Sequence, residues 1–82
     1  MKQEKNFNVA ISKVNELLFS GLAHSMTLPG TEGTFTVLAD HESLITLLKE
    51  GKIIVRTDSG EQAFSITKGL FEMSHGQVTV LV

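Results

Sequence analysis

Apolar and polar residues alternate along much of the chain, a pattern typical of β-strands with one buried face. Near the start, Phe7, Val9 and Ile11 are each separated by one smaller or polar residue. The same alternation returns in the run from Val78 to Val82. Turn signals separate such runs at short intervals, namely Pro29-Gly30, Gly33, Glu50-Gly51, Asp58-Ser59-Gly60, Lys68-Gly69 and His75-Gly76. Many short strands with glycine-containing turns predict an all-β fold, either a sandwich or a barrel.

Several glycines predict particular backbone features. The stretch Asp58-Ser59-Gly60 lies between two strand-like runs and predicts a hairpin loop, and His75-Gly76 predicts another. Gly30 and Gly33 predict a turn that needs positive φ or a tight backbone approach. Gly69 suggests a bulge or a close approach of two backbones.

The segment after Asp40 is ambiguous between helix and strand. Asp40 could cap a helix, and Leu44, Leu47 and Leu48 have the i, i+3, i+4 spacing of an amphipathic helical face. Local rules therefore favour a short helix over residues 41–49.

Composition limits the classes of function. The 82 residues are enough for one domain, residues 1–82, with 41% hydrophobic and 20% charged side chains. The net charge is -2 and the basic residues are scattered, which argues against a nucleic-acid partner. Without cysteine, disulfides, zinc–thiolate sites and thiol nucleophiles are excluded. No run approaches the ~20 apolar residues of a membrane span, so we expect no direct membrane insertion.

Candidate catalytic residues do not form a convincing set. Asp40, His41 and Glu42 are consecutive, and on an extended chain they point to opposite faces, so we expect no metal site. The serines lack a Gly-x-Ser-x-Gly context, and the glycines around Thr31 lack the lysine of a phosphate-binding loop. We therefore expect no active site and no cofactor.

The five phenylalanines are expected in the core, with Phe35 partly exposed: Phe7, Phe19, Phe35, Phe64 and Phe71.

Several motifs in order resemble one family. They are Leu18-Phe19-Ser20-Gly21, Met26 to Gly33, Val37 to His41, Leu44-Ile45-Thr46, Gly69 to Glu72, and Val78 to Leu81. Together they resemble the N-terminal β-sandwich of the epsilon subunit of F-type ATP synthase, called delta in mitochondria, over essentially the whole chain. The chain departs from that family at Asp40, where glycine or asparagine is usual, and at Thr34, which is often acidic.

The resemblance implies a fold and a set of contacts. It implies a small β-sandwich of about ten short, mostly antiparallel strands, in which the ambiguous segment is a strand and Leu44 and Leu47 are core residues. It also implies that one end of the sandwich rests on the membrane ring of c-subunits. The contact residues expected there are Thr31, Glu32, Gly33, Thr34 and His41.

The function implied by the resemblance is mechanical. A rotor subunit of the central stalk would link the gamma subunit to the c-ring at the cytoplasmic face of the bacterial inner membrane, without catalysis of its own. The family's C-terminal helical hairpin is not part of the 82 residues, so we expect coupling without inhibition of hydrolysis and without specific nucleotide binding. The alternative is a free-standing β-sandwich that binds a peptide or a glycan.

Overall fold

The computed structural model describes residues 5–82, and within them the regular structure is entirely β. The strands are β1 (Phe7–Lys13), β2 (Glu16–Ala23), β3 (Ser25–Gly30), β4 (Gly33–Leu38), β5 (Leu44–Leu48), β6 (Gly51–Thr57), β7 (Gly60–Ile66), β8 (Gly69–Ser74) and β9 (Gln77–Leu81). The predicted all-β class is confirmed, with nine strands in this part of the chain where about ten were expected.

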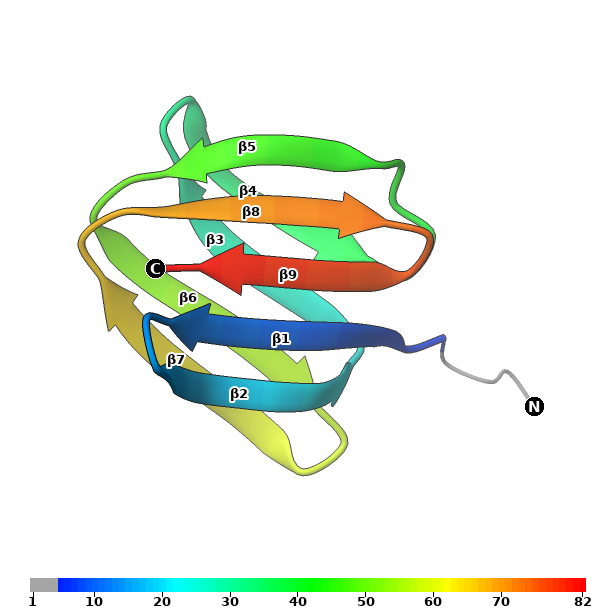
Figure 1. Cartoon of the computed structure of the whole chain (residues 1–82). Helices are drawn as coiled ribbons and strands as arrows, with labels where there is room; N and C mark the ends of the chain where they lie inside the picture. Colours follow the sequence, from blue (N-terminus) through cyan, green and yellow to red (C-terminus); the bar gives the residue numbers. More distant parts are fainter. Residues whose placement is uncertain (1–4) are drawn as a thin grey trace.

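One continuous sheet folds over into two layers (Figure 1). We call β2-β1-β9-β8-β5 the front layer and β4-β3-β6-β7 the back layer, each in spatial order. The layers are joined at a corner, where Gly30 of β3 pairs with Leu48 of β5. On the other side of the sandwich, Phe19 of β2 meets Phe64 of β7 edge to face, with ring centroids 6.1 Å apart.

Strand pairing is antiparallel except between β1 and β9, which run parallel. The mostly antiparallel arrangement is therefore confirmed. Two of the antiparallel pairs are the hairpins expected from the sequence, β6–β7 around Asp58-Ser59 and β8–β9 around His75-Gly76. Both residues of the second turn have positive φ, 52° at His75 and 74° at Gly76, which suits the twist of a two-residue hairpin.

The core lies between the two layers and consists of the inward-facing residues of the strands, which alternate with outward-facing ones. Its buried members are Phe7, Val9, Ile11, Ala23, Met26, Leu28, Val37, Leu48, Ile53, Val55, Ile66, Phe71, Met73, Val78 and Val80. Phe19, Phe35 and Phe64 are partly buried and pack against this cluster, so all five phenylalanines contribute to the core. Burying one such large side chain contributes about 1.5–3 kcal/mol, which makes this cluster the main source of stability.

The ambiguous segment is a strand, β5, as the resemblance implied. Because side chains alternate along it, Leu44, Thr46 and Leu48 point inward, while Ile45 and Leu47 point to solvent. The expectation that Leu47 is a core residue is wrong, since its side chain is 60% exposed. Leu48 is the buried leucine of this strand, at 3% exposure.

Two glycines have the roles expected from the sequence. Gly33 has φ +132°, a conformation that favours glycine, at the start of β4. At Gly69 a β-carbon would lie 2.8 Å from the carbonyl oxygen of Leu81 on the neighbouring strand. Any larger residue at position 69 would push β8 and β9 apart.

Candidate interaction surfaces

An open edge runs between β4 of the back layer and β5 of the front layer. A hollow of about 300 Å³ lies along this edge, lined by Gly30, Glu32, Gly33, Thr34, Phe35, His41, Leu44 and Thr46. Its apolar floor includes Phe35, which contacts the buried Phe71 edge to face with centroids 5.3 Å apart. We call this surface the β4–β5 edge.

The structure brings together four of the five contact residues expected from the sequence. Glu32, Gly33, Thr34 and His41 all line the β4–β5 edge and are all exposed. Glu32 lies in the turn before β4 and His41 in the connection after it, so they mark the two ends of that strand. The His41 ring is held locally, with Nδ1 2.8 Å from the carbonyl oxygen of Glu42.

Thr31 is the exception among the expected contact residues. Its backbone N–H donates to the carbonyl of Leu47 at 3.0 Å, which ties the β3–β4 turn to the front layer. Thr31 lines a different hollow, of about 420 Å³, together with Leu47, Leu70 and Leu81. It therefore belongs to the border of the front layer's outer face.

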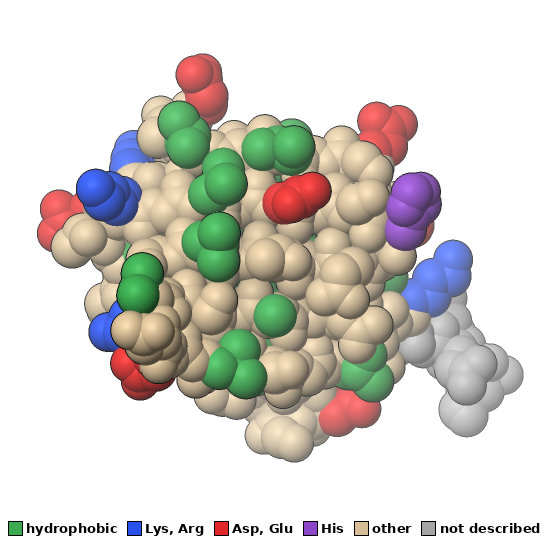
Figure 2. Space-filling model, viewed as in Figure 1, with side chains coloured by type: hydrophobic (Ala, Val, Ile, Leu, Met, Phe, Trp, Pro, Cys, Tyr) green, Lys and Arg blue, Asp and Glu red, His purple; other side chains and the backbone are tan. Residues whose placement is uncertain are grey.

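The outer face of the front layer carries an apolar row that the sequence analysis missed. Leu47 pairs with Leu70, and Leu70 pairs with Leu81 across β5, β8 and β9. Beyond Ser12 of β1, the row resumes with Leu17 of β2. Figure 2 shows hydrophobic side chains gathered in a line across this face. The four leucines are 38–63% exposed.

We call Leu17, Leu47, Leu70 and Leu81 the apolar row. Strict alternation on each strand could have marked each of these leucines as outward-facing, because they occupy positions opposite to those of the buried core, but it does not show that they are neighbours. Large apolar side chains clustered on one face are typical of a surface that another protein covers.

The outer face of the back layer is held together by polar contacts around Arg56 of β6. The guanidinium donates to the Thr27 hydroxyl at 3.0 Å and to Glu61 at 3.2 Å, and reaches the Ser25 hydroxyl at 3.4 Å. The Thr27 and Thr36 hydroxyls are 2.9 Å apart. These bonds connect β3, β4, β6 and β7 through side chains on the solvent side.

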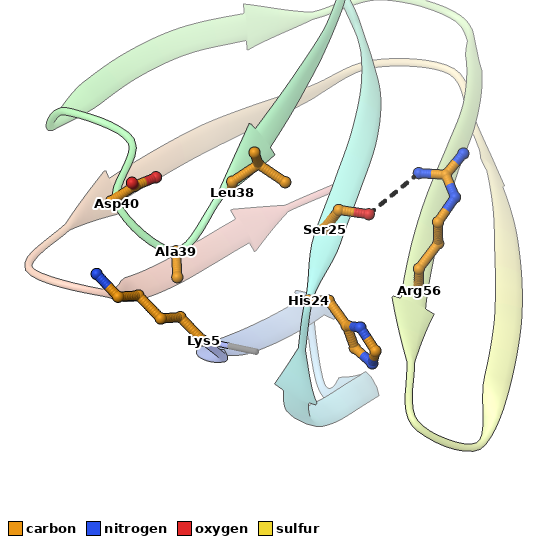
Figure 3. Close-up of a pocket in the computed structure, with 7 residues that line it drawn as sticks. All are labelled: Lys5, His24, Ser25, Leu38, Ala39, Asp40 and Arg56. Atoms are coloured by element: carbon orange, nitrogen blue, oxygen red, sulfur yellow. Dashed lines mark hydrogen bonds between the residues drawn. The ribbon is translucent and has the colours of Figure 1, made fainter. Parts of the chain in front are cut away.

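A third hollow, of about 450 Å³, opens beside this polar face (Figure 3). Its lining residues are Lys5, His24, Ser25, Leu38, Ala39, Asp40 and Arg56. In Figure 3, Lys5 and Asp40 lie on one side of the hollow, and His24 and Arg56 lie on the other. His24 Nε2 is 2.8 Å from Asp58 Oδ1, so both His24 and Arg56 have acidic partners within the protein.

Asp40, His41 and Glu42 do not converge with other side chains. Within residues 5–82, no group of three or more histidine, cysteine, aspartate or glutamate residues is arranged to hold a metal ion. The same residues contain no helix of the length and apolar character needed to cross a bilayer.

The geometry defines a two-layer β-sandwich with one apolar outer face, one polar outer face and an open edge. Residues 6–82 match the family described as "ATP synthase, Delta/Epsilon chain, beta-sandwich domain". The chain belongs to this family, and the resemblance drawn from the sequence motifs is confirmed.

Curated relatives are ATP synthase epsilon chains. The chain is 46% identical to that of Sulfurimonas denitrificans over 69 residues, which are 83% of this chain and 53% of the relative. It is 37% identical to that of Chlorobaculum tepidum over 79 residues, which are 95% of this chain and 90% of the relative. The chain thus spans about half the length of the first relative and most of the second.

Solved structures share the fold. A chain in the structure of Euglena gracilis mitochondrial ATP synthase, described as OSCP/F1/c-ring, matches with a TM-score of 0.87 at 21% identity. The match covers 94% of this chain and 50% of that one. A chain in the structure of the Tetrahymena thermophila mitochondrial ATP synthase central stalk and c-ring matches with a TM-score of 0.78 at 11% identity. This match covers 99% of the present chain and 66% of the Tetrahymena chain.

Proposed function

We propose that this domain works as a rotor part of an F-type ATP synthase, between the gamma subunit and the c-ring. The observation that carries the proposal is the family match along residues 6–82, on a sandwich whose outer surfaces differ in chemistry. A part that transmits torque must bind two neighbours at once. Two separate surfaces, the apolar row and the β4–β5 edge, meet that requirement.

The apolar row is the surface that we assign to the gamma subunit. A lasting interface has an apolar centre, and Leu47, Leu70 and Leu81 supply one from three adjacent strands. The back layer lacks an equivalent row: Thr27 and Arg56 on its outer side are hydrogen-bonded to each other, and the outward apolar residues Leu38 and Ile54 lie in separate cross-strand rows. We therefore expect the front layer to face gamma and the back layer to face solvent.

The β4–β5 edge is the surface that we assign to the polar loops of the c-ring. Glu32, Thr34 and His41 offer exposed polar groups around a shallow hollow, which suits contact with hydrophilic loops. Exposed charges at such a contact affect the rate of encounter and the register of the partners more than the fold. Thr31 and Gly33 complete the turn that presents Glu32.

The role is structural, and catalysis belongs to other subunits of the complex. We also propose that the domain resides at the cytoplasmic face of the bacterial inner membrane, where it is held through gamma and the c-ring. The bacterial epsilon chains among its relatives support this location.

The test is reconstitution. An ATP synthase depleted of its epsilon subunit should regain ATP-driven ion pumping when the 82-residue chain is added, and the purified gamma subunit should bind the chain directly. A chain with Leu70→Ser and Leu81→Ser is the matched control, and it should restore neither binding nor pumping. Failure of the unmodified chain to bind gamma would refute the proposal.

A further inference from the structure

One acidic side chain lies within the apolar face of the front layer. Glu72 of β8 pairs with Ile45 of β5 and with Thr79 of β9, one row away from Leu47, Leu70 and Leu81. Alternation puts Glu72 and Leu70 on the same side of β8, with the buried Phe71 between them. Figure 2 shows an acidic side chain among the hydrophobic ones on this face.

Glu72 is an acidic residue without an ion-pair partner that lies on a strand of the apolar face, whereas three other acidic side chains are paired. Glu61 pairs with Arg56 at 3.2 Å, Asp58 contacts His24 at 2.8 Å, and Glu16 pairs with Lys13 at 3.7 Å. Among residues 5–82, no ion pair or side-chain hydrogen bond involves Glu72. Its carboxylate is therefore hydrated in the isolated domain and contributes nothing to the internal contacts of the sheet.

A protein that covers the apolar row also takes this carboxylate out of water. Burying an unpaired charge is unfavourable, and the cost is offset only when a cation and further hydrogen bonds meet it. The row spans the four strand spacings from β5 to β2, which is about 19 Å at ~4.8 Å each, so a partner that covers it encloses the neighbouring Glu72 too.

We propose that the partner of the front layer presents a lysine or arginine to Glu72, flanked by apolar side chains that contact the row. The inference rests on the proposed function, in which that partner is the gamma subunit. Glu72 then fixes the register of the interface. An apolar row alone would let the partner slide along it, whereas one charge pair at a fixed distance from the row selects a single position.

The experiment measures binding of the purified gamma subunit to three forms of the chain, namely the unmodified chain, Glu72→Gln and Glu72→Lys. We expect Glu72→Gln to weaken binding about tenfold and Glu72→Lys to weaken it further, because like charges then meet. Glu42→Gln, in the exposed connection before β5, is the matched control and should bind as the unmodified chain does. Binding of the unmodified chain should also weaken with added salt more than binding of Glu72→Gln.

Melting temperatures of all forms should agree within a few degrees, because the Glu72 side chain makes no ion pair or hydrogen bond within residues 5–82. Tight binding of gamma with equal affinity for Glu72→Gln and the same salt dependence would overturn the inference while leaving the proposed function intact. Absence of binding by the unmodified chain would refute both. Stronger binding of Glu72→Gln would mean that the partner covers the carboxylate with apolar groups, which also contradicts the inference.

Discussion

Both outer faces of the sandwich consist of the outward-facing residues of alternating strands, but one face is apolar where the other carries bonded polar groups. In the front layer, outward positions hold Leu47, Leu70 and Leu81, which pair with each other across strands and remain 38–60% exposed. In the back layer, comparable positions hold Thr27 and Arg56, whose polar groups bond to neighbours on other strands. The polar groups around Arg56 on the back face already have partners within the domain. The leucines of the front face leave water only when another protein covers them.

This difference separates binding from stability. Both layers contribute inward residues to one core, and the back layer is also held together by the polar bonds around Arg56 on its outer side. Substitutions on the front face should therefore change association and leave folding intact. Substitutions on the back face should change folding stability and leave association intact.

The largest expected effect is on the front face. Leu70→Ser with Leu81→Ser should weaken gamma binding at least about 100-fold, because both side chains lie centrally in the apolar row and central apolar residues dominate interface energy. The change should be measured by titration calorimetry. A matched double substitution on the back face, Thr36→Ser with Ala63→Ser, should bind gamma normally. Equal losses in both variants would remove the distinction between the faces.

On the back face, the largest effect should come from Arg56. Arg56→Met removes the donor that links Thr27, Ser25 and Glu61, and it should lower the free energy of unfolding by about 1–2 kcal/mol. Arg56→Lys should lower the free energy of unfolding by less than Arg56→Met does, because it keeps a positive donor. It should still be less stable than the unmodified chain, because an ammonium group lacks the planar fork that contacts several acceptors. Urea denaturation measures the difference. Gamma affinity should stay within about twofold for both variants, and a larger change would show that the back face also binds.

The smallest expected effects concern the β4–β5 edge. Glu32→Ala with His41→Ala should leave the melting temperature nearly unchanged, because both side chains are exposed and lie outside the core. Assembly with the c-ring should weaken severalfold, as is typical for charges at an interface rim. Thr31→Ala, whose backbone contact persists without its side chain, serves as the comparison. A large loss of stability in the double variant would show that these residues are structural.

Sequence reasoning predicted the strands better than it predicted their outer faces. Phe7, Val9 and Ile11 are the inward half of β1 as expected, at 0–2% exposure. The helix-like spacing of Leu44, Leu47 and Leu48 gave the wrong local preference, and pairing of β5 with β8 decided for a strand. Leu47 was expected inside, together with Leu44, from the resemblance, but residues three positions apart on a strand point to opposite faces.

The apolar row could not be located from sequence alone, since it depends on contacts between distant segments. Leu47, Leu70 and Leu81 become neighbours only through the pairing of β5 with β8 and of β8 with β9. The parallel pairing of β1 with β9 is likewise invisible in the local pattern. The resemblance grouped Thr31 with Glu32 as contact residues, yet the two residues line different hollows.

The most direct test of the account uses the absence of cysteine in the chain. A single cysteine at Thr79 reports on the front face, one at Ala63 on the back face and one at Thr34 on the β4–β5 edge. In the assembled enzyme, we expect gamma to protect Thr79→Cys from a maleimide and the c-ring to protect Thr34→Cys, while Ala63→Cys reacts as fast as in the free domain. Protection of Ala63→Cys with free reaction of Thr79→Cys would contradict the assignment of the two faces.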